Sequence, residues 1–160
     1  MNTIQKALSL QGIDAAWQGD EPADVMEITS DYLTEVINGK PRMIRSEDDD
    51  GRAVNIIQLR MDYNNLVSTT LNERRIAAIK AKAGEIITAV MPDWKQRNML
   101  ARSIELVNIA NEREYTPAEQ TELDELNAFW TWVKLVRAAS NAAEAEGKQV
   151  YQVIWPEYNQ

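Results

Sequence analysis

The stretch that decides the fold is residues 116–136, TPAEQTELDELNAFWTWVKLV. Thr116 is a residue type that caps helix starts, Pro117 suits the first helical position, and Glu119 completes a capping box. From this start we predict a helix over residues 117–146. The chain is therefore expected to be organised around one long helix in its second half.

This predicted helix carries apolar residues on two sides. At 100° per residue, Leu126, Phe129 and Val133 fall on one side, which is an ordinary core face. A helix that is apolar nearly all round is buried on two sides. Either the rest of the domain covers the second face, or that face meets another chain, and the pattern leaves both open. The residues predicted to contact a partner, on this second face and in the C-terminal tail, are Ala128, Trp132, Leu135, Ala139, Trp155 and Tyr158.

Two further helices are predicted before it. Apolar residues recur at helical spacing over residues 76–90, and Pro92 ends this segment because the residue before a proline is pushed out of helical geometry. Asp93 can cap a second helix. The apolar positions expected to face the core in that second helix are Met99, Leu100, Ile104, Leu106 and Val107.

The first sixty residues are expected to be less regular. Helical spacing predicts a short helix over Thr3–Leu10, and the Gly-, Pro- and acid-rich segment 14–24 is predicted to be a loop anchored by Trp17. The strands of a β meander are predicted at residues 32–37, 43–44 and 53–59, and the apolar tail at 150–156 could add another.

The predicted fold class is therefore α+β and mostly helical, with a small antiparallel β meander at the front followed by a three-helix C-terminal bundle. We divide the chain into an acidic segment with the short helix and the meander at 1–60, a helical module at 61–147, and a tail at 148–160 that packs on the body.

Composition limits the chemistry of the chain. Among its 160 residues there is no Cys and no His. These absences exclude a disulfide scaffold, a thiol nucleophile, a Ser-His-Asp triad and an ordinary zinc site. The acidic run Glu47–Asp50 before Gly51 fails as a calcium loop, because Ile57 would stand where a bidentate carboxylate is required. We expect a protein that is not an enzyme and that has no cofactor and no metal.

The charge distribution narrows the choice of partners. The net charge is -8, and residues 1–70 carry 6 Lys and Arg against 12 Asp and Glu. This balance argues against binding to nucleic acid or to an anionic membrane. The acidic front is interpreted as a solvated face, with mimicry of nucleic acid as the alternative. No apolar run approaches the length of a membrane span, and the first residues lack the pattern of a secretory signal, so we expect a cytoplasmic location.

Two stretches resemble known proteins. Residues 91–102, MPDWKQRNMLAR, followed by the Thr-Pro-Ala-Glu cap and by residues 127–141, NAFWTWVKLVRAASN, resemble the helical module of small tailed-bacteriophage tail proteins. This resemblance covers roughly residues 73–146. Residues 48–54, DDDGRAV, are faintly similar to the β-rich front of phage tail-fibre assembly proteins.

The resemblance implies a non-enzymatic protein that binds the tail fibre and assists its folding, trimerisation or attachment. It would act in the host cytoplasm during assembly and could stay in the virion tail. The alternatives are a structural component of the virion tail or baseplate, and an acidic inhibitor of a host defence protein. The expected partner is a tail-fibre or baseplate protein, and a homo-oligomer is a further possibility.

Overall fold

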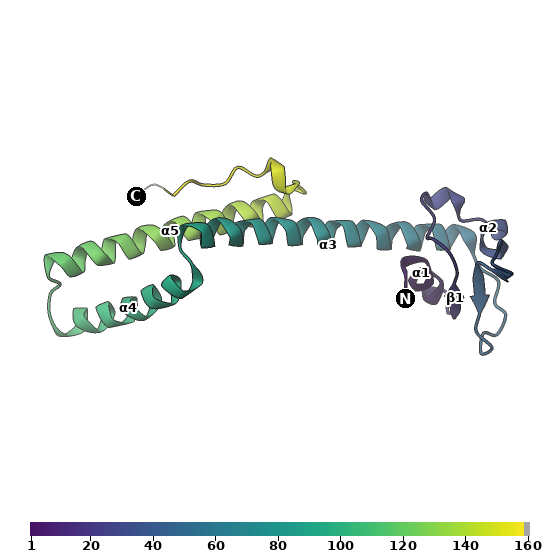
Figure 1. The fold of residues 1–160 in the computed structure, drawn as a ribbon, viewed down its shortest axis with the longest axis horizontal. Coiled ribbons are helices and arrows are strands. Elements are labelled where there is room, and N and C mark those ends of the chain that lie inside the picture. Colours follow the sequence, from purple (N-terminus) through teal and green to yellow (C-terminus); the bar gives the residue numbers. More distant parts are fainter. Residues whose placement is uncertain (159–160) are drawn as a thin grey trace. The chain divides into compact units, whose positions relative to one another are not determined.

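A computed structural model describes residues 1–158 (Figure 1). The chain divides into two compact units, Met1–Glu73 (unit 1) and Arg74–Gln160 (unit 2). The fold is α+β and mostly helical, as the sequence predicted, with antiparallel strand pairs near the N-terminus before the long helices. The elements, in chain order, are α1 (Thr3–Leu10), β1 (Ala15–Trp17), η1 (Val25–Glu27), α2 (Ser30–Thr34), β2 (Val36–Ile37), β3 (Lys40–Pro41), β4 (Met43–Arg45), α3 (Ile56–Val90), α4 (Asp93–Glu112), α5 (Pro117–Ala145) and η2 (Val150–Gln152).

Unit 1 has a core built from α1, the start of α3 and the segments between them. Ile4 and Leu8 of α1 and Leu59 of α3 are fully buried. Removing such side chains from water stabilises the fold by about 1.5–3 kcal/mol each. The buried residues of this core are Ile4, Ala7, Leu8, Ile13, Ala15, Ile28, Leu33, Leu59 and Tyr63.

Side-chain to main-chain hydrogen bonds tie the parts of unit 1 together. The Gln11 amide donates to the Asn55 carbonyl at 3.1 Å and accepts from the Asn55 N–H at 2.9 Å. The buried Tyr63 hydroxyl donates to the Pro22 carbonyl at 3.1 Å. These bonds hold the first turns of α3 against segments that lie far away in the sequence.

The strands of unit 1 differ from the predicted meander. β4 pairs with β1, which lies inside the predicted loop, and Trp17 is opposite Met43. β2 and β3 form a separate short hairpin. The predicted third strand at 53–59 is wrong, because the Asn55 side chain accepts from the Gln58 N–H at 3.1 Å and so caps the start of α3.

Unit 2 has its core between α3 and α5. Phe129 and Val136 of α5 are fully buried and pack with Ile87 of α3 in one apolar cluster. α3 ends at Val90, immediately before the Met91-Pro92 pair that predicted this end. The predicted additional strand in the tail is wrong, since Val150–Gln152 forms a turn of 3₁₀ helix.

α4 turns a different side inward than the sequence suggested. Leu106 is buried and Met99 is half-buried, whereas Leu100, Ile104 and Val107 are 55, 59 and 58% exposed. The prediction of a core position is therefore wrong for these three residues. The helix carries two apolar stripes, one with Met99 and Leu106 and one with the exposed three, and periodicity alone does not say which one faces α5.

The start of α5 follows the prediction. The Thr116 hydroxyl accepts from the Glu119 N–H at 3.3 Å, and the Glu119 carboxylate accepts from the Thr116 N–H at 2.8 Å, so the capping box is confirmed. At the other end Gly147 adopts a φ of 72°, which other residues rarely tolerate. Arg75 donates to the carbonyls of Glu144 and Lys148 at 3.0 and 2.9 Å, which ties α3 to the end of α5 and the residues that follow it.

Candidate partner-binding groove

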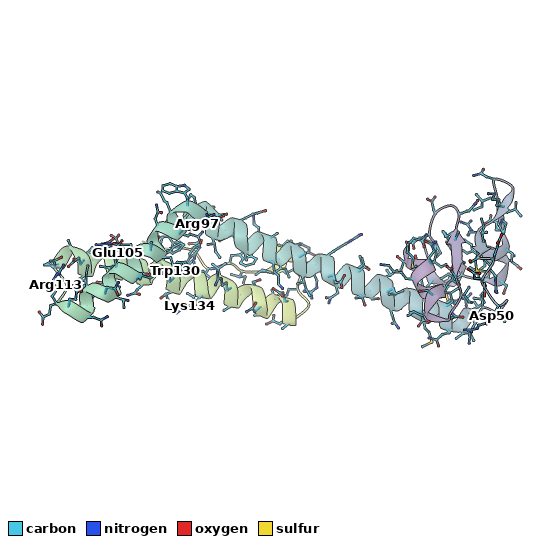
Figure 2. The ribbon with its side chains drawn as sticks, turned by 90° about the horizontal axis from the view of Figure 1, so that it is seen from below. Asp50, Arg97, Glu105, Arg113, Trp130 and Lys134 are labelled. Atoms are coloured by element: carbon cyan, nitrogen blue, oxygen red, sulfur yellow. The ribbon has the colours of Figure 1, made fainter. Side chains whose placement is uncertain are left out.

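An open groove of about 790 Å³ runs between α4 and α5 in unit 2. Met91 and Tyr158 also border it, so the α3–α4 turn and the tail contribute to its wall. The side chains of this unit are drawn in Figure 2, in which Arg97 marks α4 and Trp130 and Lys134 mark α5. The α4 and α5 residues that line the groove are Lys95, Asn98, Met99, Arg102, Thr121, Glu122, Asp124, Glu125, Leu126 and Ala128.

The lining combines apolar and charged side chains. Met99, Leu126 and Ala128 give it apolar surface that continues to Tyr158. Methionine side chains adapt to irregular surfaces, so such a floor suits a peptide or a helix better than one rigid small molecule. Asp124 and Glu125 place two carboxylates on the α5 side of the same groove.

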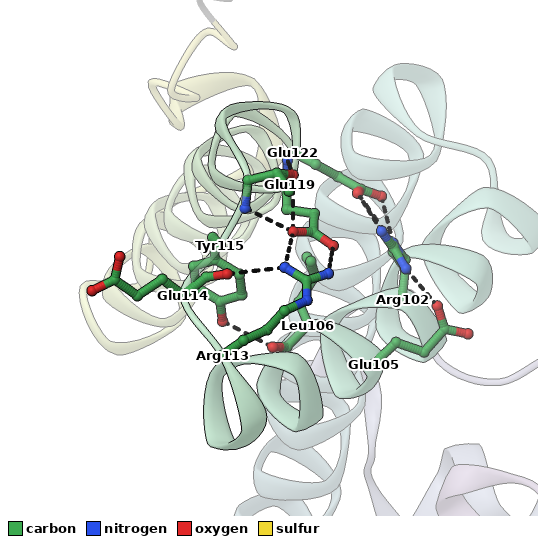
Figure 3. A network of polar contacts seen from close by, with 9 residues as sticks. Arg102, Glu105, Leu106, Arg113, Glu114, Tyr115, Glu119 and Glu122 are labelled. Carbon is green, nitrogen blue, oxygen red and sulfur yellow. Dashed lines mark hydrogen bonds and ion pairs between the residues drawn. The ribbon is translucent and has the colours of Figure 1, made fainter.

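Arg102 links the two helices beside the groove (Figure 3). Its Nε and Nη2 donate to the two carboxylate oxygens of Glu122, each at 2.9 Å, and Nη1 donates to Glu105 at 2.8 Å. Hydrogen bonds from Arg102 lower the pKa of the Glu122 carboxyl, and the same bonds raise the pKa of the guanidinium. The bidentate geometry fixes the direction of approach as well as the charge pairing.

A second ion pair lies at the α4–α5 connection, also visible in Figure 3. Arg113 donates to the Glu119 carboxylate at 2.7 and 2.8 Å. Together with the Thr116 N–H and hydroxyl, these bonds lower the pKa of Glu119 to about 2. The Tyr115 hydroxyl donates to the Leu106 carbonyl at 2.9 Å. Polar contacts thus join α4 and α5, which form a helical hairpin, around a single fully buried α4 side chain, Leu106.

The C-terminal tail covers the part of the second apolar face of α5 that contains Trp132. The Trp132 indole N–H donates to the Pro156 carbonyl at 3.0 Å, and the rings of Trp132 and Tyr158 lie 5.1 Å apart. Tyr158 also meets the Phe129 ring edge-on at 6.0 Å, and Trp155 packs against the same cluster. Trp155, Pro156 and Tyr158 of the tail therefore contact α5 in unit 2.

The six predicted partner residues lie in four different surroundings. Trp132 is only 5% exposed, so the prediction that it offers a partner surface is wrong, because the chain's own tail covers it. Trp155 and Ala139 are half-buried. Ala128 and Tyr158 line the groove, and Leu135 is 54% exposed outside it. Partner contact stays a prediction for all but Trp132.

Sequence reasoning missed two sets of exposed apolar residues in unit 2. One set is Leu100, Ile104 and Val107 of α4, which periodicity assigned to the core. The other consists of Tyr151 and Ile154 in the tail, which are 81 and 91% exposed. The signal for the first set was present in the sequence as a second stripe on α4, but it was interpreted as inward-facing.

Residues 1–158 contain no group of three or more acidic side chains arranged to hold a metal ion. In the acidic run 47–50, Asp49 instead accepts from Arg45 at 3.0 Å with its side chain 1% exposed, and Asp50 pairs with Arg52. Within the same residues, no helix combines the length and apolar character needed to cross a membrane. Comparisons with protein-family models, curated proteins and solved structures found no significant match to this chain.

Proposed function

We propose that this protein is a non-enzymatic component of bacteriophage tail assembly that binds the tail fibre and assists its folding, trimerisation or attachment. The resemblance of residues 91–102 and 127–141 to phage tail proteins supports the class of protein. The exposed apolar surface of unit 2 supports binding to another protein as its mode of action. Its expected site of action is the host cytoplasm, with retention in the virion tail as the alternative outcome.

The observation that carries the proposal is the apolar surface on α5 and the tail. The tail covers the second apolar face of α5 at Trp132 but leaves Leu135 on that face 54% exposed. Ile154 in the tail is 91% exposed. A contiguous apolar patch on the surface of a protein is typical of a site that a partner covers, and we propose that Leu135 and Ile154 belong to such a patch. A fibre that buries these side chains on association would gain about 25 cal/mol per Å² of apolar area removed from water.

The acidic front gives less support to inhibition of a host defence protein. Several of its carboxylates accept hydrogen bonds within unit 1: Glu21 from the Ile4 N–H, Asp24 from the Met26 N–H and Glu27 from the Ala23 N–H. The hydrogen bonds within unit 1 therefore set the orientation of these carboxylates. A mimic of nucleic acid needs instead a row of carboxylates presented to its target.

The test is co-expression of a tagged copy with the tail-fibre protein of the same phage, followed by size-exclusion chromatography with light scattering. We expect a stable complex with the wild-type chain, loss of that complex for Leu135→Glu and Ile154→Glu, and retention for Asn141→Glu. Asn141 is an exposed α5 position that lies about 120° around the helix from Leu135, so it adds the same charge on another side. No complex with the wild-type chain, or equal loss in all three variants, would contradict the proposal.

Whether the protein leaves after assembly is a separate question for purified particles. A protein that stays in the tail should be detected in virions at a stoichiometry set by tail symmetry. If the protein only assists assembly, removal of its gene should lower the yield of trimeric fibre, and the protein should be absent from the particle.

A further inference from the structure

The exposed side of α4 forms a narrow apolar stripe. Leu100, Ile104 and Val107 are spaced i, i+4 and i+7, so they lie above one another on one face of the helix. Each is more than half exposed. Arg97 precedes them by one turn on the same side and is exposed, and it forms no ion pair within residues 1–158. The stripe therefore presents three apolar anchors and one unpaired cation.

The groove between α4 and α5 has the complementary character. Its apolar floor includes Met99 and Ala128. Arg102 and Glu122 neutralise each other there, since they form an ion pair. The remaining charged lining residues are Lys95, Asp124 and Glu125, so the α5 wall of the groove carries an excess of negative charge.

The stripe and the groove lie on different sides of α4. Groove residues Met99 and Arg102 are rotated by about 100° or more from Leu100 and Ile104, because each residue turns the helix by about 100°. One molecule can therefore offer its stripe to a neighbour and accept a stripe in its groove at once. Such a head-to-tail contact is heterologous, and it builds either a ring or an open chain of copies.

We propose that the groove binds the α4 stripe of a second copy of this chain. Leu100, Ile104 and Val107 of one copy enter the groove of the next, as amphipathic helices commonly enter hydrophobic grooves. Arg97 then meets the carboxylates of Asp124 and Glu125, which fixes the orientation of the inserted helix. The proposal is independent of fibre binding, because it uses neither Leu135 nor Ile154.

The first test measures self-association of the full chain by light scattering from about 10 μM to about 1 mM, a range that detects weak dissociation constants. Ile104→Glu removes the central anchor, and Ala128→Lys fills the groove and adds a cation beside the acids. We expect each variant to weaken association at least about tenfold. Matched controls are Leu71→Glu, which changes an equally exposed leucine in unit 1, and Ala138→Lys, which lies on α5 outside the groove.

The decisive step is to mix the two variants. Ile104→Glu keeps an intact groove and Ala128→Lys keeps an intact stripe, so together they form one functional contact and should give a 1:1 dimer that grows no further. Charge reversal supplies a second reading: Arg97→Glu should weaken association, and Glu125→Arg in the same chain should restore it. Circular dichroism of each variant establishes that it remains folded.

Three results would overturn the proposal. One is a wild-type chain that stays monomeric up to the highest concentration. The second is association that Ile104→Glu abolishes and Ala128→Lys leaves intact, which would show stripe-to-stripe pairing about a two-fold axis. The third is a mixture of the two variants that remains monomeric although each is folded.

Discussion

The contacts that stabilise unit 1 internally differ in kind from the contacts that join α4 to α5, the helical hairpin of unit 2. In unit 1 the long-range bonds run from side chains to main chain, as in the Gln11–Asn55 exchange and the Tyr63–Pro22 bond. In the hairpin, Arg102 and Arg113 reach across to Glu122 and Glu119. A hydrogen bond from a side chain to a main-chain group requires the two elements to lie close together. An ion pair between two long side chains can join elements whose main chains lie further apart.

The difference explains why the groove lies where it does. Unit 1 closes its core with residues from many short segments, among them Ile13, Ile28 and Leu33, all of which are buried. The α4–α5 hairpin buries Leu106 alone among the α4 side chains, and the Arg102–Glu122 and Arg113–Glu119 ion pairs join its two helices at the surface. A helix pair held at its edges by ion pairs leaves apolar surface open between them, and that surface is available to a partner.

The largest effect should come from the residue that joins the tail to α5. We expect Trp132→Ala to lower the free energy of unfolding of unit 2 by about 3–5 kcal/mol, because it removes a buried ring and leaves the Pro156 carbonyl unpaired. Hydrogen-exchange mass spectrometry should show lost protection in residues 74–158 and retained protection in the core of unit 1. Leu135→Ala, at an exposed position of the same helix, is the control and should cost less than about 1 kcal/mol.

Two tyrosines test the comparison directly, since each donates one hydroxyl bond to a carbonyl. Tyr63→Phe in unit 1 should cost about 1–3 kcal/mol, because the buried Pro22 carbonyl loses its partner where water does not enter. Tyr115→Phe in the hairpin should cost about 0.5–1 kcal/mol, because the site is only partly buried and water can replace the hydroxyl. Denaturant unfolding of both variants measures this difference. Equal losses would mean that the hairpin is as closed as unit 1.

Local signals in the sequence predicted the helix ends that neighbouring residues determine, but they missed α2, where a strand was predicted, and the start of α3 at Ile56. The Thr116 capping box and the Met91-Pro92 stop each act through neighbouring residues, so the start of α5 and the end of α3 were both found. The short helix Thr3–Leu10 was found from its spacing. The mostly helical α+β class followed from these elements.

The errors arose where a distant contact decides the outcome. Residues 53–59 have the apolar pattern of a strand, yet Asn55 caps α3 and exchanges hydrogen bonds with Gln11, which is remote in sequence. β1 was missed because a strand of three residues is stabilised only by its partner β4. Tertiary contacts of this kind leave no periodic trace in the sequence.

The structure distributes the predicted partner residues over different surroundings, and their contact with a partner stays a prediction. Ala128 and Tyr158 line the groove, and Leu135 is exposed, but Trp132 lies beneath the tail. The two-sided helix predicted at 117–146 left open whether the chain itself or a partner covers its second face. Only the path of the tail shows that residues 155–158 cover part of it, and this path depends on ring contacts and on the Trp132–Pro156 bond.

The smallest expected effect, and the most specific to the hairpin, is its response to acid. The bonds from Arg113 and Thr116 hold the pKa of Glu119 near 2, below the ordinary value of 4.5, and Arg102 lowers the pKa of Glu122 in the same direction. A depressed pKa means that the ionised carboxylate stabilises the folded hairpin, so this contribution is complete above pH 4.5 and is lost as the pH falls toward 2.

Amide exchange of α4 and of the start of α5 should therefore accelerate over this range, with a smaller change at the neutral Gln11–Asn55 contact in unit 1. Raised salt at neutral pH should act in the same direction, since exposed ion pairs are screened. Glu119→Gln removes the titrating group and should flatten the acid response of the α4–α5 connection. If that variant kept the full response, Glu119 would not be its source, and the contrast between the two regions would have to rest on packing alone.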